Sequence, residues 1–229
     1  MDRTRGVVFT LAGVCLAAGL WAFPAEYRAV VATQGPALDW YLVPDAPPLP
    51  PLRSAEATYK VMVACDTALG SLTSRLMPAS ARAEVATRCL DAADAVLTTA
   101  PGLAPAHLVR ATALTQLAIQ DPGGPDAQRL SEVSLALRFA ERRGPDLMWM
   151  VVRRMELAVA LFDGLPAEGR AVLARDLGRI LANGREGQVH HLARLYRRNE
   201  DVQGFILATV EALPPGQQRR FLWALRANG

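Results

Sequence analysis

The sequence contains few of the residues that metal centres and nucleophilic enzymes use. Its 229 residues include three histidines and three cysteines, and they form no His-Glu-x-x-His, repeated Cys-x-x-Cys, Gly-x-Ser-x-Gly or phosphate-loop motif. His190 and His191 are adjacent, so on a helix they point about 100° apart and do not form a metal pair by themselves. We therefore expect no metal site, no cofactor, no small-molecule substrate and no enzymatic activity.

Aromatic residues are also scarce, at 6%, and few of them alternate with basic residues. Because single-stranded nucleic acids stack on aromatic side chains beside cations, we expect no nucleic-acid partner. The net charge is only +3, and we interpret the arginine-rich stretch 141–229 as a solvated surface. After Ser54 the β-branched residues form no alternating strand pattern, which predicts an all-α body.

The three cysteines divide into one within an apolar N-terminal run and two in the body. Cys65 lies 13 residues before Pro78, where we expect a turn, and Cys89 lies 11 residues after it. In an antiparallel helix hairpin these positions lie at nearly the same height on facing apolar seams, within reach of disulfide geometry. We expect a Cys65–Cys89 disulfide. Two small buried thiols are the alternative, and the absence of Cys-x-x-Cys argues against redox catalysis.

Charge is absent from one long stretch, Gly6 to Phe23. These 18 residues reach about 27 Å as a helix, close to the hydrocarbon thickness of a bilayer. We predict a transmembrane anchor at 6–23. A signal peptide cleaved after Ala17-Ala18-Gly19 is the main alternative, and lipidation at Cys15 is disfavoured because Val14 is too large for a lipobox.

The flanking charges predict the orientation of this anchor. Arg3 and Arg5 precede the apolar run and only Arg28 follows it closely, so residues 1–5 are expected to stay in the cytoplasm. The body would then lie in the periplasm, on a single-pass protein of a bacterial inner membrane. Trp21 and Tyr27 suit the headgroup region at the far end of the span.

Residues 24–53 are expected to connect the anchor to the body. A short helix over 25–41, interrupted at Pro36, would lie near the membrane surface. The proline-rich stretch 44–51 is then predicted to be an extended, stiff spacer.

The body shows helical periodicity broken by proline and glycine. The most apolar predicted helix, 146–162, is expected to be buried on more than one face. Short connections favour antiparallel neighbours and a stack of helix hairpins. The predicted helices are 55–76, 79–99, 105–120, 126–142, 146–162, 167–183, 187–198, 201–213 and 216–227.

Two segments of the body share a pattern. Residues 93–111 and 136–154 each combine a helix end, a proline turn and a new amphipathic helix, with Pro101 and Pro145 44 residues apart. This pattern resembles tetratricopeptide repeats, although the usual period of 34 residues and the Trp-x-x-Leu-Gly-x-x-Tyr pattern are absent. The resemblance implies a helical-repeat α-solenoid over 54–183, a C-terminal helical cap over 184–229 and a concave surface that binds protein.

On that concave surface we expect partner binding by His107, Arg110, Trp149 and Arg153. The predicted function is a scaffold or assembly factor in a cell-envelope complex, in polysaccharide export, cytochrome maturation or the divisome. Alternatively, the chain is an accessory subunit of a membrane enzyme, bound through its transmembrane helix, where glycines at 6, 13 and 19 permit close approach.

A helical hydrolase is the least favoured hypothesis, because it requires a buried glutamate in a cleft. Glu156 is the only candidate, and we expect it to pair instead with Arg153 or Arg154, or with a neighbouring helix. Asp91 and Asp94 have the spacing of a carboxylate pair on one helix face, but we interpret them as a solvated face.

Overall fold

The computed structural model describes residues 3–34, 55–71, 74 and 76–227, and within 3–34 the side chains of 7–21, 23, 24 and 27. The predicted linker 24–53 lies outside these residues from position 35 onward. The described part of the chain is all helical. Its helices are α1 (Arg3–Gln34), α3 (Ala55–Gly70), α5 (Ala79–Thr99), α6 (Ala104–Gln120), α7 (Ala127–Arg143), α8 (Met148–Ala160), α9 (Ala167–Asn183), α10 (Glu186–Arg198), α11 (Glu200–Glu211) and α12 (Pro215–Ala227).

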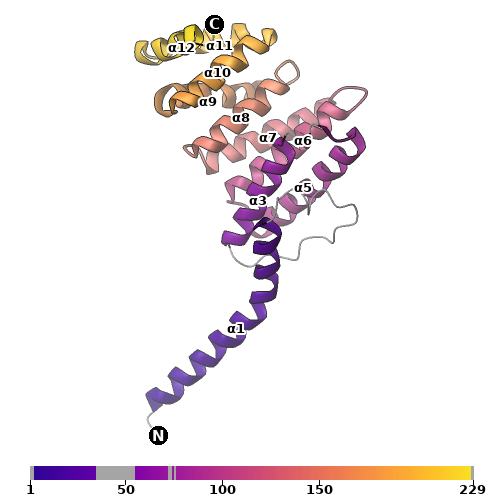
Figure 1. Cartoon of the computed structure of the whole chain (residues 1–229), viewed down its shortest axis with the longest axis vertical. Helices are drawn as coiled ribbons and strands as arrows, with labels where there is room; N and C mark the ends of the chain where they lie inside the picture. Colours follow the sequence, from indigo (N-terminus) through magenta and orange to yellow (C-terminus); the bar gives the residue numbers. More distant parts are fainter. Residues whose placement is uncertain (1–2, 35–54, 72–73, 75, 228–229) are drawn as a thin grey trace.

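Helix α1 extends away from the body as a long, bent rod (Figure 1). It runs through Pro24, so the anchor predicted at 6–23 and the helix predicted from residue 25 form one continuous helix as far as Gln34. Proline removes a backbone donor and bends a helix, but good helix formers on both sides sustain it here. Among the described residues, no helix is both long enough and apolar enough to cross a membrane. Within the predicted anchor 6–23, the side chain of Ala22 lies outside the described set.

Proline and glycine turns place the other helix ends almost where the sequence predicts them. Eight of the nine predicted body helices agree with the structure to within two residues at each end. The first one, predicted to reach residue 76, is an exception. Helix α3 ends at Gly70, and Leu76, the last residue of the predicted helix, is 79% exposed.

The early end of α3 has a local cause at Gly70 and Ser71. Glycine weakens a helix, and the Ser71 hydroxyl donates to the carbonyl of Ala68 at 2.9 Å. The same hydroxyl accepts the backbone N–H of Ser74 at 3.0 Å. Such side-chain bonds replace the helical pattern with a turn.

The body is a stack of helix pairs, α3/α5, α6/α7, α8/α9 and α10/α11, closed by α12 (Figure 1). The first helices of successive pairs are neighbours, in the order α3, α6, α8, α10 and α12. The second helices α7, α9 and α11 are also neighbours. The predicted all-α stack of packed helices is therefore confirmed. The apolar core of the predicted cap 184–229 is continuous with that of α6 to α9.

Two apolar cores meet at α6. One core joins α3, α5 and one face of α6, and the other joins the opposite face of α6 to the helices that follow. Cys65 and Cys89 lie fully buried in the first core, as the hairpin geometry predicts. Their sulfur atoms are 2.24 Å apart and their Cα atoms 5.8 Å apart, which is disulfide-bonding distance.

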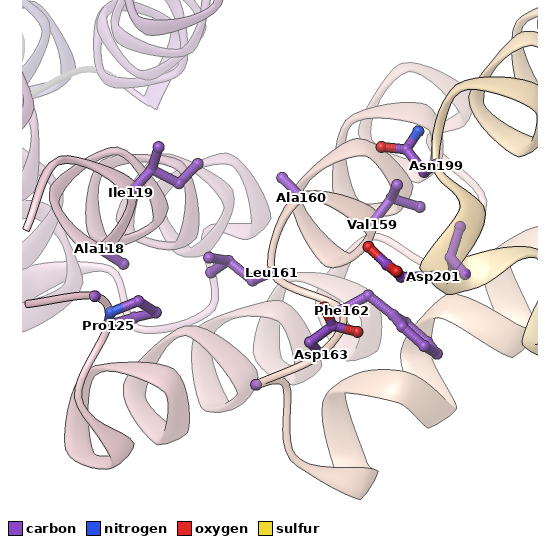
Figure 2. Close-up of a pocket in the computed structure, with 13 residues that line it drawn as sticks. Ala118, Ile119, Pro125, Val159, Ala160, Leu161, Phe162, Asp163, Asn199 and Asp201 are labelled. Atoms are coloured by element: carbon purple, nitrogen blue, oxygen red, sulfur yellow. The ribbon is translucent and has the colours of Figure 1, made fainter.

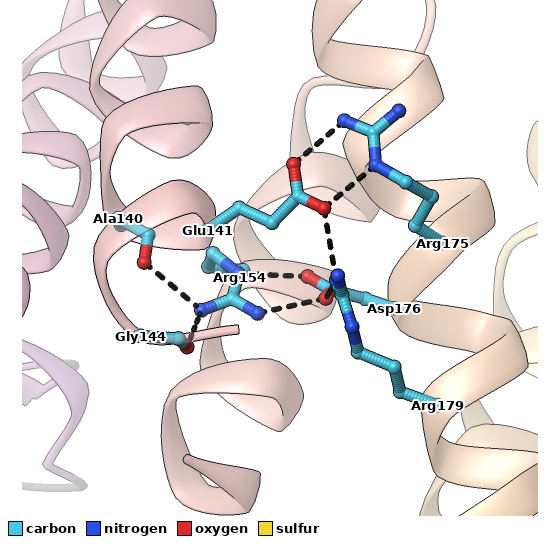
Figure 3. Close-up of polar contacts among 7 residues, drawn as sticks. All are labelled: Ala140, Glu141, Gly144, Arg154, Arg175, Asp176 and Arg179. Atoms are coloured by element: carbon cyan, nitrogen blue, oxygen red, sulfur yellow. Dashed lines mark hydrogen bonds and ion pairs between the residues drawn. The ribbon is translucent and has the colours of Figure 1, made fainter. Parts of the chain in front are cut away.

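In the second core, α8 and α9 are joined by the fully buried ion pair Arg154–Asp176 (Figure 3). Arg154 donates from Nε to Oδ2 at 2.8 Å and from Nη2 to Oδ1 at 2.7 Å. Its Nη1 donates to the carbonyls of Gly144 and Ala140, at 3.1 and 3.5 Å, and so satisfies the end of α7.

The ion pair continues toward the surface of α9. Arg179 donates to both Asp176 and Glu141 at 2.9 Å, and Arg175 makes two bonds of 2.6 Å to Glu141. Burial raises the pKa of the Asp176 carboxyl more than the hydrogen bonds from Arg154 and Arg179 lower it. The hydrogen bonds are therefore needed to hold this charge in the core.

Removing the cysteine pair should destabilise the body. We expect Cys65→Ala/Cys89→Ala to lower the free energy of unfolding by about 3 kcal/mol, because a crosslink restricts the unfolded chain. Urea unfolding of the oxidised full chain in detergent measures this difference. Cys15→Ala is the matched control and should leave stability unchanged. Equal stability of the two variants would contradict the pairing.

Removing one partner of the buried ion pair should be more costly. Asp176→Ala leaves the Arg154 charge buried, and we expect a loss of about 3–5 kcal/mol in unfolding free energy. Asp146→Ala, at an exposed turn, should change it by no more than about 0.5 kcal/mol. The double variant Arg154→Met/Asp176→Leu removes both charges and should be more stable than Asp176→Ala. If it is no more stable, the unpaired charge of Arg154 is not the cause of the loss.

Candidate functional site

A row of polar side chains crosses the first helices of four successive pairs. We call Asp66, Thr112, Arg153, Glu156 and His191 the polar row; they lie on α3, α6, α8, α8 and α10. Asp66 accepts from the Thr112 hydroxyl at 2.8 Å and from Arg153 Nε at 3.0 Å. Glu156 accepts from Arg153 Nη1 at 2.9 Å and contacts His191 Nε2 at 2.7 Å. The row therefore links the disulfide-bearing end of the stack to α10.

Arg153 is the centre of the polar row. Its side chain and that of Asp66 are only 15% and 14% exposed, so this ion pair is screened less than a surface pair. Gly70 gives the guanidinium its room, because a Cβ at that position would lie 3.1 Å from Nη2. Nη2 is buried and has no hydrogen-bond partner within the described part of the chain.

Glu156 has the environment of a structural carboxylate. Burial raises the pKa of the Glu156 carboxyl, but the hydrogen bonds from His191 and Arg153 lower it by more, so the net shift is downward. A general acid needs a raised pKa, so this environment disfavours the hydrolase hypothesis. Glu156 pairs with Arg153 and with His191 on the neighbouring helix α10, both among the expected kinds of partner, while Arg154 pairs with Asp176.

Of the four predicted partner-binding residues, the two on α6 make contacts within the chain. His107 is buried, its Nε2 lies 2.9 Å from the carbonyl of Pro101, and its ring stacks on Phe139 at 5.1 Å. Arg110 donates to Asp94 at 2.9 Å. Asp94 therefore pairs with a cation instead of forming a carboxylate pair.

The two predicted residues on α8 differ from each other. Trp149 is half-buried against the larger core, and Arg153 belongs to the polar row. Each of the four residues has its own contacts within the chain. Their role in partner binding stays a prediction. Arg110 and Trp149 are the two that are partly exposed and lie outside the polar row.

The adjacent histidines face different neighbours. His191 contacts Glu156, whereas His190 lies 3.4 Å from Glu186 and its ring lies 4.8 Å from that of Trp223. Within the residues that the structure describes, no group of three metal-ligating side chains comes together.

A pocket of about 330 Å³ opens where the turns α6–α7, α8–α9 and α10–α11 meet. We call it the turn pocket. Figure 2 shows Ile119 and Pro125 on one side and Val159 and Asn199 on the other. Its lining residues are Ala118, Ile119, Gly124, Pro125, Val159, Ala160, Leu161, Phe162, Asp163, Gly164, Asn199, Asp201 and Val202.

No motif in the sequence indicates the turn pocket. The sequence pattern marks 121–126, 161–166 and the junction before α11 only as helix breaks, although acidic residues lie at each of them. Their repeated place, after the first helix of a pair, is the signal that puts them on one edge of the stack.

The lowered pKa of Glu156 predicts how stability depends on pH. The contribution of the Glu156 carboxylate to the free energy of unfolding is fully present above its unfolded pKa of 4.5. It is lost as the pH falls through the lower pKa of the folded state. The stability advantage of the wild type over Glu156→Gln should therefore shrink between pH 7 and about pH 3.5. Urea unfolding at a series of pH values measures it. Glu168→Gln, at an exposed position on α9, is the control, and a difference that grows on acidification would refute the assignment.

A scan against models of protein families, a search of curated proteins and a search of solved structures each found no match to this chain. Function must therefore be inferred from its own contacts and surfaces.

Proposed function

We propose that this chain is a membrane-anchored, tetratricopeptide-like scaffold or assembly factor of a bacterial cell-envelope complex. In this proposal residues 6–23 span the inner membrane once and the helical body lies in the periplasm. Polysaccharide export, cytochrome maturation and the divisome are the settings that fit such a protein.

The exposed apolar surface of α1 is the observation that carries the proposal. Its large apolar side chains, from Val7 to Tyr27, are 57–76% exposed. Monomeric proteins rarely expose continuous apolar surface of this kind to water, so another phase or another protein is expected to cover it. The stretch 6–23 carries no charge on any side of the helix, as lipid surroundings require.

Two independent features support the orientation and the compartment. Arg3 and Arg5 lie before the apolar stretch, which favours a cytoplasmic N-terminus. Cys65 and Cys89 lie at disulfide-bonding distance, and such bonds persist in oxidising compartments such as the periplasm.

The body supports a binding role more than a catalytic one. Stacked helix pairs offer long surfaces to other proteins, and the polar row holds their first helices in a fixed arrangement. The best candidate for an acid catalyst, Glu156, is held as a carboxylate by Arg153 and His191. Arg110 and Trp149 are the proposed contacts for a partner. They lie on the first helices of two pairs, α6 and α8, and we call the surface formed by these first helices the first-helix surface.

The anchor predicts how the protein fractionates. Leu11→Arg/Leu16→Arg places two charges in the span, at a cost of about 2.5–3.5 kcal/mol each near its centre. We expect the wild type to stay in membranes through a carbonate wash and most of the variant to be released. Leu135→Arg/Leu222→Arg, at exposed leucines of α7 and α12, is the matched control and should stay with the membranes.

A reporter fused to the C-terminus, active only outside the cytosol, tests the orientation, and activity only inside the cell would overturn it. Crosslinking in native membranes then separates the two roles of the anchor. A partner that is still captured without residues 1–23 identifies the body as the binding module. Loss of capture would favour the accessory-subunit alternative.

A further inference from the structure

In three of the pairs, α6/α7, α8/α9 and α10/α11, the residues that directly follow the first helix carry charge of one sign. The segments 121–126, 161–166 and 199–201 contain no lysine or arginine, in a chain whose net charge is +3. The stack places these turns along one edge, around the turn pocket (Figure 2). Their acidic residues are Asp121, Asp126, Asp163, Glu200 and Asp201.

Two of these carboxylates have local structural roles. Asp126 caps α7 by accepting from the backbone N–H of Arg129 at 2.6 Å. Asp121 accepts from the backbone N–H of Gly123 at 3.1 Å and lies 3.5 Å from Arg129 Nη1. Asp121 and Asp126 are therefore occupied by the turn between α6 and α7.

The two carboxylates that line the turn pocket are different. Asp163 and Asp201 are exposed and form no ion pair with any side chain in the described ranges. Asp201 also lies in the first turn of α11, where a negative charge is favourable. Beside them, Asn199 donates through Nδ2 to the carbonyl of Leu195 at 2.7 Å, which leaves its side-chain oxygen as a further acceptor.

The apolar part of the pocket is already in place. Phe162 is held by Phe205, with ring centres 5.2 Å apart, and by the Arg170 guanidinium, 5.4 Å from the ring centre. Arg170 is itself fixed by a 2.8 Å bond to the carbonyl of Leu165. Across the pocket, Ile119 is 53% exposed. An apolar side chain that entered here would bury Ile119 and meet a rigid aromatic wall.

We propose that the turn pocket binds a short peptide segment of a protein partner, in which an apolar side chain lies next to a lysine or arginine. The apolar side chain packs between Ile119 and Phe162, and the cation lies between the carboxylates of Asp163 and Asp201. This inference deepens the proposed function, on which it rests, by assigning a chemistry to the scaffold's partner.

Charge and size favour this occupant over others. An acidic segment would be repelled by Asp163 and Asp201, and a purely apolar one would cover these carboxylates without pairing them. A volume of about 330 Å³ is at the small end for a site that encloses a whole ligand, but it suits one or two side chains of a longer segment.

Fluorescence anisotropy with the purified full chain in non-ionic detergent tests the proposal. The probe is a fluorescein-labelled peptide of sequence Gly-Ser-Leu-Lys-Leu-Arg-Gly-Ser, with detergent alone as the blank. Two matched peptides replace both basic residues by glutamate or both leucines by serine. Only the first peptide should bind well, and its affinity should fall as NaCl is raised from about 50 mM to about 500 mM.

Variants assign the binding to the pocket. Asp163→Asn/Asp201→Asn should weaken binding of the probe by about fivefold or more, since two charge pairs are lost. Ala160→Trp places a bulky ring at the pocket wall and should also weaken it. Asp91→Asn/Asp146→Asn removes the same charge at exposed positions outside the pocket and should leave the affinity unchanged.

Three results would overturn the inference: no binding of the probe, equal binding of the serine peptide, or equal affinity of the pocket and control variants. Equal binding of the serine peptide would reduce the site to a simple cation site. The failure of the proposed function is distinguishable, because fractionation and reporter activity test it without the peptide. Binding of the probe to a chain that is not membrane-anchored would keep the pocket and reject the scaffold's location.

Discussion

The buried pair Arg154–Asp176 is the interaction on which the arrangement of the stack depends. Arg154 and its neighbour Arg153 leave α8 in different directions, because consecutive residues on a helix point about 100° apart. Arg154 reaches Asp176 on α9 and the carbonyls at the end of α7, whereas Arg153 reaches Asp66 on α3. These two guanidinium groups fix the rotation of α8 about its axis. That rotation determines which side chains of α8 join the polar row. It also determines the position of the residues at the C-terminal end of α8, which form a wall of the turn pocket.

The described surfaces of the protein have three distinct chemistries. Helix α1 is apolar and exposed, the first-helix surface has charges largely paired within the polar row, and the edge at the turn pocket is acidic. Internally paired charges leave little unsatisfied attraction for a partner, whereas unpaired carboxylates beside an apolar wall offer both charge and hydrophobic contact. A scaffold built in this way would hold its partners by its edges as much as by its broad faces.

The sequence was sufficient for the fold at the level of elements. Proline and glycine fix helix ends through backbone geometry, so turns such as 121–126 were predicted within two residues, and the register of Cys65 with Cys89 followed from hairpin geometry. The end of α3 was missed because it depends on one serine side chain, Ser71. The continuation of α1 through Pro24 was missed because proline lowers helix propensity without forbidding a bent helix.

The candidate site was harder to predict, because it depends on pairing between helices. In the sequence Arg153 and Arg154 are equivalent, and only the packing of α8 decides that Arg153 pairs with Asp66 in the polar row and Arg154 with Asp176 in the core. The turn pocket joins three turns that are far apart in the chain, and no local pattern indicates which of their carboxylates lack a partner.

Helix α6 has a further consequence for how this architecture tolerates change. Since the two cores cover opposite faces of the helix, its alanines at 106, 111 and 113 are completely enclosed. Even one added methylene there would force two helix layers apart. Drift during evolution should therefore spare these small residues. A search for distant homologues should therefore start from these positions, where the side-chain volume cannot increase, and not from overall sequence identity.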